Sequence, residues 1–278
     1  MRAFKRYQAL ELVDRAAALA YYAMLALFPG LLVAVTLLGL LGQQSLVTQI
    51  VDYLTRHGAD PTTAATLRNA LTAVIRASHG ALGAALGISV LLGLNGASGA
   101  YAAAGRALNA IHGVHDERGF VRGKLENVGM TLVVLALILV VLVAVFLGGG
   151  IVDDIARGLG LGHTTASVWG IARWPLAVVA AMGVYSVVYA YGPAIRPPAL
   201  RWITPGATVG VVLWMLASLG FAIYIRNFSH YGAAYGAAGA AIVLLLWLFI
   251  SANAFLFGAT LNVELERELD PAGQAAGR

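Results

Sequence analysis

The segment His112-Gly-Val-His115-Asp116-Glu117 is the part of this sequence that comes nearest to a metal site. Its two imidazoles stand three residues apart and two carboxylates follow, and zinc accepts both kinds of ligand. The spacing differs, however, from the H-E-x-x-H pattern with which a helix presents two histidines to a catalytic zinc. Since no third anchor follows nearby in the sequence, we interpret the segment as a solvated loop and predict neither a metal site nor a cofactor.

Other kinds of catalysis find little support in the sequence. The chain has no cysteine, which excludes thiolate chemistry and disulfide bonds, and no serine stands in a G-x-S-x-G elbow. A nuclease needs acidic or histidine ligands for one or two metal ions around the phosphate. The remaining acids on the same predicted side show no such spacing; they are Glu11, Asp14, Glu126 and those of residues 264–270. We therefore predict that the protein is not an enzyme and binds no nucleic acid.

The composition is that of a membrane protein. Hydrophobic residues make up 60% of the 278 residues and charged residues 11%, whereas about 25% of the residues in an ordinary soluble domain are charged. The longest run without Asp, Glu, Lys or Arg, residues 227–263, exceeds the roughly 20 residues with which a helix crosses a bilayer. The sequence therefore excludes a soluble globule and predicts an all-α, polytopic membrane protein.

Six apolar segments are long enough to span the bilayer, and they define a transmembrane domain over residues 16–264. The predicted spans are residues 16–42, 80–105, 128–151, 174–191, 204–225 and 231–263. Pro29 is expected to kink the first span, because a proline inside a helix removes one backbone hydrogen bond. Trp174-Pro175 is expected to open the fourth span, because proline is favoured in the first turn of a helix.

Three further segments lie outside these spans. Residues 1–15 and 43–79 carry charges between their apolar residues, so we predict amphipathic helices at the membrane interface. Residues 265–278 form a charged tail. Lys and Arg are twice as numerous in the terminal segments and in the loops after the second and fourth spans as in the other loops. The positive-inside rule then places both termini in the cytoplasm.

Polar side chains and closely spaced glycines occur within the spans. Polar groups in hydrocarbon are costly unless they find partners within the protein, so these side chains either line a cavity or only cross-link helices. The sequence leaves both interpretations open. The candidates for lining a cavity are Asn95, Ser98, Ser218, Ser251, Asn253, Thr260 and Asn262. The candidates for close helix packing, paired at G-x-x-x-G spacing, are Gly83 with Gly87 and Gly232 with Gly236.

Four basic residues follow the second span: Arg106, Arg118, Arg122 and Lys124. Basic residues just cytoplasmic of a span attract acidic lipids, so these four are candidates for binding an anionic head group. The alternative is that they only set the topology. No charge interrupts the predicted spans, which argues against a pathway for a small hydrophilic ion.

Segments throughout the chain carry a family resemblance. They are residues 20–29 (AYYAMLALFP), 106–114 (RALNAIHGV), 118–122 (RGFVR), 202–206, 213–214, 221–227, 235–236, Trp247 and 258–262 (GATLN). In these segments the chain resembles the YihY/BrkB family over nearly its whole length. The resemblance implies a six-helix protein of the bacterial inner membrane. It also implies membership of a family long mislabelled as ribonuclease BN and linked to transport of lipids or other amphiphiles.

One position departs from the family pattern. Similar proteins often carry Glu in a Gly-Ala-Glu motif of the last helix, where this chain has Thr260. If that acid couples transport to an ion in the relatives, this chain does without it or uses Glu264, one turn later.

We therefore hypothesise a transporter or flippase-like carrier of an amphiphilic, anionic, lipid-like molecule. Its expected partners are membrane lipids and further copies of the same chain. Two alternatives stay open: a membrane-embedded enzyme, including the older ribonuclease label, and a scaffold that transports nothing.

Overall fold

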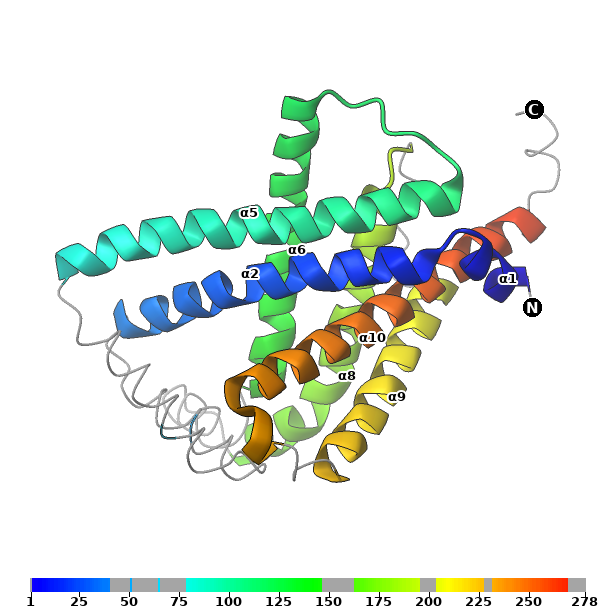
Figure 1. Ribbon diagram of the computed structural model, residues 1–278. Helices are drawn as coiled ribbons and strands as arrows, with labels where there is room; N and C mark the ends of the chain where they lie inside the picture. The colour runs from blue at the N-terminus through cyan, green and yellow to red at the C-terminus, as the bar shows by residue number, and fades with distance from the viewer. Residues whose placement is uncertain are drawn as a thin grey trace. The chain divides into compact units, whose positions relative to one another are not determined.

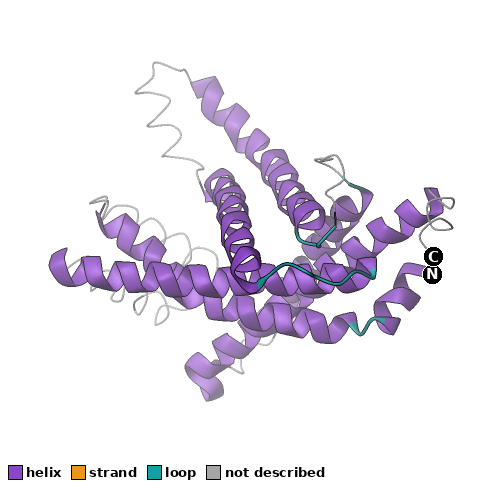
Figure 2. Cartoon of the chain, turned by 90° about the horizontal axis from the view of Figure 1, so that it is seen from above, coloured by secondary structure: helices purple, strands orange, loops and turns teal. Residues whose placement is uncertain are grey.

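The computed structural model of the protein describes residues 2–40, 51, 65, 79–146, 163–195, 204–227 and 232–269. In this part of the chain every regular element is a helix (Figure 1, Figure 2). The helices are α1 (Arg2–Ala9), α2 (Leu12–Leu40), α5 (His79–His112), α6 (Phe120–Phe146), α8 (His163–Tyr191), α9 (Pro205–Asn227) and α10 (Gly232–Leu269). The predicted all-α class is thus confirmed for the described residues.

Three stretches of the described chain are long and apolar enough to cross a membrane. They are Val168–Tyr191, Pro205–Ile225 and Ala241–Glu268. These stretches overlap the predicted spans at residues 174–191, 204–225 and 231–263. Helices α2, α5 and α6 lie where the other three spans are predicted, and the total of six spans remains a prediction.

Helix α8 differs from the predicted fourth span at its start. It begins at His163, so Pro175 lies inside the helix and not in its first turn. Membrane helices tolerate an internal proline because neighbouring groups can supply the missing hydrogen bond. The earlier start also places Arg173 within the candidate span Val168–Tyr191. The predicted span at residues 174–191 carries no charge, whereas this longer stretch includes Arg173, whose guanidinium carbon lies 5.2 Å from the centre of the Trp174 ring.

The chain divides into two compact units, Met1–Tyr22 with Ser98–Arg278 and, separately, Ala23–Ala97. In the smaller unit, α2 and α5 come close together. A Cβ atom added to Gly96 would lie 3.0 Å from the Cα atom of Ala26. Since that neighbour is backbone, a larger residue at this position would push the two helices apart.

In the larger unit the helices pack in a series. Helix α6 packs along α8, α8 contacts α9, and α9 packs along α10. Helix α1 contacts α10 near the C-terminal end of that helix (Figure 1). The side chains of Leu12, Leu108, Ile111 and Leu256 are fully buried and form the centre of the core.

Several predictions fall outside the described residues. They concern most of the interfacial segment at residues 43–79, residues 270–278 of the tail, and the side-chain surroundings of Pro29, Gly83, Gly232 and Gly236. Helix α2 continues through Pro29. A Cβ atom added to Gly87 would meet nothing within 4 Å in the described part of the chain. The kink and packing roles of these residues remain predictions.

Candidate functional site

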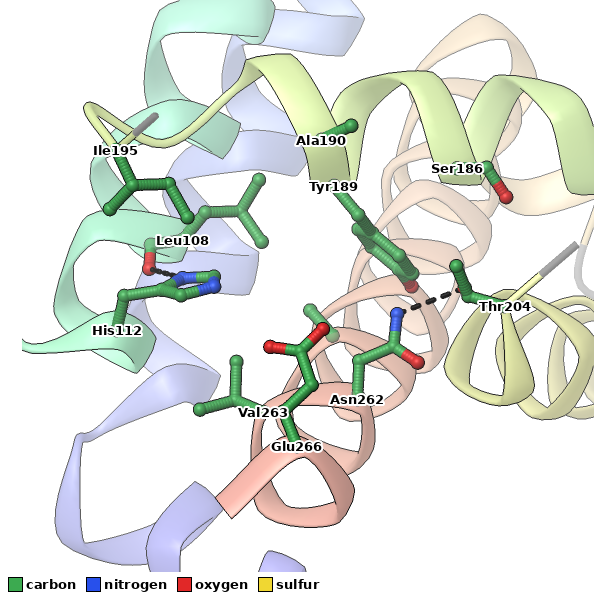
Figure 3. Close-up of a pocket in the computed structure, with 11 residues that line it drawn as sticks. Leu108, His112, Ser186, Tyr189, Ala190, Ile195, Thr204, Asn262, Val263 and Glu266 are labelled. Atoms are coloured by element: carbon green, nitrogen blue, oxygen red, sulfur yellow. Dashed lines mark hydrogen bonds between the residues drawn. The ribbon is translucent and has the colours of Figure 1, made fainter. Parts of the chain in front are cut away.

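A cavity of about 330 Å³ lies where the C-terminal parts of α5, α8 and α10 meet the start of α9 (Figure 3). It is lined by Leu108, His112, Ser186, Tyr189, Ala190, Ile195, Thr204, Ala259, Asn262, Val263 and Glu266. All of these residues belong to the larger unit. The volume is within the range of sites for small molecules.

The lining combines apolar and polar surface. Leu108 and Val263 contribute hydrocarbon, whereas His112, Tyr189 and Glu266 bring polar groups. Among the described residues that line it there is no Lys or Arg. Ligand sites are commonly apolar with a few placed polar groups that fix orientation. This cavity therefore suits a molecule with an apolar part and a polar head.

His112 forms one side of the cavity, and Figure 3 shows its ring facing inward. Its Nδ1 atom lies 2.9 Å from the carbonyl oxygen of Leu108. Because a carbonyl oxygen can only accept, Nδ1 carries the hydrogen. In the neutral ring, Nε2 is then a hydrogen-bond acceptor.

Asn262 connects α10 to the first turn of α9. Its Oδ1 accepts from the backbone N–H of Gly206 at 2.7 Å, and its Nδ2 donates to the hydroxyl of Thr204 at 2.9 Å. The Thr204 hydroxyl also accepts from the N–H of Ala207 at 3.1 Å, as an N-cap residue does. The first N–H groups of a helix have no partner within that helix. These bonds satisfy two of them and fix one edge of the cavity.

Next to Asn262, α9 and α10 meet backbone to backbone. A Cβ atom added to Gly258 would lie 2.7 Å from the Tyr189 hydroxyl and 3.0 Å from the Cα atom of Gly210, and it would collide with the Gly206 carbonyl. A Cβ atom on Gly206 would collide with the Gly258 carbonyl in turn. Gly206 and Gly210 have the G-x-x-x-G spacing typical of close helix contacts. Glycine is therefore required on both helices at this crossing.

Two further hydrogen bonds extend this interface along α9 and α10. The indole N–H of Trp214 donates to Ser251, and that of Trp247 donates to Ser218, each at 3.2 Å. Ser218 follows Trp214 on α9, whereas its partner Trp247 precedes Ser251 on α10. The two helices therefore run antiparallel. Within hydrocarbon such groups would otherwise be unpaired, and the bonds fix α10 firmly against α9.

Tyr189 lies between this interface and the cavity. Its hydroxyl donates to the carbonyl of Phe255 at 2.6 Å, and the two ring centres are 4.9 Å apart. These contacts pack the tyrosine ring against α10. The residue also lines the cavity.

On another side of the cavity, the end of α5 packs against the end of α8. A Cβ atom added to Gly105 would lie 2.8 Å from the carbonyl oxygen of Gly192. The buried Asn109 accepts from the N–H of Ala194 at 2.6 Å. These contacts fix residues 192–195 and hold Ile195 at the cavity.

Helix α1 binds α10 and the end of α5. Arg6 forms an ion pair with Glu264 at 3.2 Å and also donates to the carbonyl of Ile111. The Tyr7 hydroxyl donates to the Oδ1 atom of Asn253 at 2.6 Å, and burial raises the pKa of Tyr7 to about 12. The predicted N-terminal amphipathic segment therefore contains a helix with one face docked on the protein.

The structure places the predicted cavity residues in different surroundings. Asn262 lines the cavity, whereas Ser218 and Ser251 join α9 to α10. Asn253 binds Tyr7, and the fully buried Thr260 donates to the carbonyl of Leu256 at 2.8 Å. The structure thus brings Ser218, Ser251 and Asn262 to one helix interface. A role for these residues along a transport path remains a prediction.

Two predicted cavity residues lie on α5. Ser98 is buried in the larger unit and accepts from the Nζ atom of Lys124 at 2.9 Å. Asn95 is exposed and belongs to the smaller unit. Lys124, a predicted head-group residue, thus has a hydroxyl partner on the neighbouring helix.

Of the other predicted head-group residues, Arg118 and Arg122 bind carboxylates. Arg118 pairs with Asp116 at 2.6 Å and with Glu126 at 3.1 Å, and Arg122 pairs with Glu126 at 2.9 Å. The hydrogen bond from Arg118 holds the pKa of Asp116 below its usual value, and those from Arg122 and Arg118 do the same for Glu126. Arg106 is exposed, and its guanidinium carbon lies 5.9 Å from the centre of the Tyr22 ring.

The histidine segment does not gather ligands in the described chain. His112 faces the cavity, whereas His115 is exposed on the loop after α5. Among the described residues, no group of three or more His, Asp or Glu side chains is placed to hold a metal ion.

Sequence reasoning missed Glu266, Leu108 and Ile195 as cavity residues, because a helix end outside a span gives no periodic signal of its own. Two signals were available. The G-x-x-x-G spacing of Gly206 and Gly210 marks the close crossing beside the cavity. The predicted topology also brings the ends of the second, fourth and sixth spans to one side of the membrane.

An all-helical fold with candidate spans and a cavity at the helix ends defines the protein as a helical membrane protein. The profile of the family described as "Virulence factor BrkB" matches residues 3–278. The chain therefore belongs to the BrkB family, and the resemblance found in the sequence is confirmed.

Relatives of the chain differ in how they are named. The ribonuclease-like protein YfkH of Bacillus subtilis is 28% identical over 265 residues, which cover 95% of this chain and 94% of that protein. A UPF0761 membrane protein of Xanthomonas campestris is 37% identical over 93 residues, 34% of this chain and 21% of that protein. A UPF0761 membrane protein of Xanthomonas oryzae is 34% identical over 93 residues, again 34% of this chain and 21% of that protein. No solved structure matches the chain.

Proposed function

We propose that this protein is a transporter or flippase-like carrier, which moves an amphiphilic, lipid-like molecule between the leaflets of the bacterial inner membrane. The cavity is the observation that carries the proposal. It has hydrocarbon from Leu108 and Val263 beside polar groups of His112, Tyr189 and Glu266. Of the helices that line it, α8 and α10 contain candidate membrane spans. A lipid head group with the first part of its chains needs both kinds of surface.

The proposed substrate also carries an anionic group, such as a lipid phosphate. Support comes from the basic residues around the loop after α5. The four predicted head-group residues outnumber the three acids of residues 106–127, which are Asp116, Glu117 and Glu126. The excess positive charge attracts phosphate, and basic residues near a membrane surface contribute about 1 kcal/mol each to binding acidic lipids.

The test is transport of labelled lipid by the purified full-length protein in vesicles. A quencher added outside reports how fast labelled head groups reach the outer leaflet. We expect exchange to be faster than in vesicles without protein. If vesicles with and without protein exchange lipid at the same rate, for phospholipids of several head groups, the proposal is overturned.

A substitution that fills the cavity makes this test specific. Ile195→Trp adds an indole at a residue that lines the cavity, and we expect transport to fall to near the rate of empty vesicles. Ile223→Trp is the matched control, because Ile223 is exposed on α9 and lies outside the cavity lining. Equal transport by both variants would show that the cavity is not on the path.

The name of the relative YfkH favours a second candidate, a membrane-embedded nuclease. A His112→Ala/His115→Ala variant tests the segment closest to a metal site. Metal analysis and an RNA cleavage assay on wild type and variant should give no bound metal and no difference in cleavage. RNA cleavage by the wild type that the variant loses would favour the nuclease.

A scaffold that organises partners is the third candidate, suggested by the amphipathic terminal segments. Pull-down from membranes separates it from a carrier. A stable protein partner together with unchanged lipid exchange would favour the scaffold. Membrane lipids and a homo-oligomer remain the partners that we propose for the carrier.

A further inference from the structure

Three acids near the end of α10 have different surroundings. Glu264 pairs with Arg6 at 3.2 Å, and Glu268 pairs with Arg2 at 3.1 Å. Glu266, which lies between them in the sequence, lines the cavity, and no cation of the described chain lies within ion-pair distance of it. Figure 3 shows its carboxylate directed into the space between His112 and Tyr189. The arginines of α1 thus neutralise two acids and leave a third facing the cavity.

The other polar groups at the cavity are acceptors or are already satisfied. The Nδ1 hydrogen of His112 is used on the Leu108 carbonyl, so Nε2 of the neutral ring accepts. Tyr189 donates its hydrogen to Phe255 and keeps acceptor lone pairs. Both ends of the Asn262 amide bind α9. As far as the described residues show, the cavity therefore presents a carboxylate and further acceptors without a basic side chain.

A primary ammonium group complements this arrangement. It has three hydrogen-bond donors, no acceptor and a positive charge. A phosphate in the same position would face the Glu266 carboxylate, and like charges brought together oppose binding. We infer that the cavity binds a primary ammonium group on the head of the amphiphile, with Glu266 as its counter-ion.

This inference rests on the proposed function and narrows its substrate. An amphiphile with both a phosphate and an ammonium group carries the anionic group of the proposed substrate and also the cation that complements Glu266. The substrate class is then a zwitterionic aminophospholipid. A free amine carries the same ammonium chemistry without the chains, so the experiment includes it.

The decisive comparison is between two short-chain lipids that bind the full-length protein in detergent. One is phosphatidylethanolamine, and the other is its N-acetylated form, which keeps the phosphate and the chains but has no ammonium group. Because Glu266 is exposed and an exposed ion pair contributes up to about 1 kcal/mol, we expect up to about fivefold tighter binding of the unmodified lipid. Equal binding, tighter binding of the acetylated lipid, or no binding of either overturns the inference. If free ethanolamine binds as tightly as the lipid, the assignment to an amphiphile is overturned.

Glu266→Gln tests the counter-ion, since it keeps the shape of the side chain and removes its charge. We expect this variant to lose the preference for the unmodified lipid. The matched control, Glu268→Gln, changes an exposed acid that pairs with Arg2 outside the cavity, and it should keep the preference. A preference that persists in Glu266→Gln overturns the role of Glu266. Should that variant fail to fold, the comparison of the two lipids on wild-type protein decides whether the ammonium group is preferred, and the same comparison on Ile195→Trp decides whether the preference depends on the cavity.

Failure of this inference is distinguishable from failure of the carrier proposal. If both lipids exchange equally fast in vesicles, the carrier proposal stands and the ammonium site is overturned. If the protein in detergent prefers the unmodified lipid but exchanges no lipid in vesicles, the ammonium site stands and the carrier proposal is overturned.

Discussion

Helix α10 is closed on one side and open on another. Toward α9, Gly258 meets Gly206 and Gly210 so closely that no Cβ atom fits. Toward the ends of α5 and α8, α10 borders a cavity of about 330 Å³ with His112 and Ile195 on the far walls. The same helix thus forms a rigid contact and a binding surface within a few residues.

The comparison shows what each side requires. Close helix contacts in membranes depend on small residues and on hydrogen bonds between helices, and the α9 side has both. The open side has larger side chains, among them Leu108, His112 and Glu266. Asn262 and Tyr189 border both regions. We conclude that the close contact with α9 fixes the position of α10, and that the cavity on the other side of α10 therefore persists without further packing there.

The largest expected effect comes from forcing the closed side apart. Gly258→Ala places a Cβ atom against backbone of α9, which cannot move without separating the helices. Overpacking of this kind costs about 3 kcal/mol. We expect a large drop in the thermal midpoint of the protein in detergent. Gly220→Ala is the control, since a Cβ atom there meets nothing within 4 Å in the described chain and Ala favours the helix by about 1 kcal/mol. Similar midpoints for the two variants would contradict the importance of this crossing.

Much of the fold could be predicted from the sequence, because hydrocarbon imposes a length and a composition on each helix. The helical class and the three candidate spans follow from that constraint. The start of α8 could not be predicted this way, since Trp174-Pro175 is typical of a helix start as well as tolerated within a membrane helix.

The candidate site was less accessible to sequence reasoning. Polar residues such as Ser251 and Asn253 indicate only that partners exist, and the partners lie on other helices, Trp214 on α9 and Tyr7 on α1. Glu266 lies in a charged segment, where a sequence pattern cannot distinguish acids with an ion-pair partner from one without a partner among the described residues. The distinction depends on where the arginines of α1 lie, which is a long-range contact.

A second prediction concerns the border between the closed and the open side. Asn262→Leu removes the acceptor of the buried Gly206 N–H and the donor to Thr204. A buried group left without its partner costs about 1–3 kcal/mol, so we expect about 2 kcal/mol lower stability and a correspondingly lower midpoint. Asn262→Asp keeps an acceptor for Gly206 next to the start of α9, where negative charge is favourable, and should lose less. If both variants unfold alike, the Gly206 bond contributes little.

A third, smaller effect is expected where α1 holds α10 from outside the cavity. Tyr7→Phe keeps the ring against Phe257 and removes the hydroxyl that donates to Asn253. One such hydrogen bond contributes about 1 kcal/mol, and the thermal midpoint should fall slightly. Tyr21→Phe, at a mostly exposed tyrosine, should leave the midpoint unchanged. A fall of the same size in both would show that the change reflects the detergent and not the contact of α1 with α10.

The smallest effect is expected in the loop after α5, whose residues are not among those that line the cavity. Its Asp116 carboxyl has a lowered pKa because Arg118 donates hydrogen bonds to it. A lowered pKa stabilises the folded state above the unfolded value of about 4, and the contribution disappears as the pH falls through the folded value. Asp116→Asn should therefore be less stable than wild type at pH 7, and the difference should shrink below about pH 4. Because the pair is partly exposed, the difference at pH 7 should stay below about 1 kcal/mol. Thermal midpoints of both proteins at pH 7 and pH 3 measure it, and a gap that widens on acidification would contradict the assignment to this ion pair.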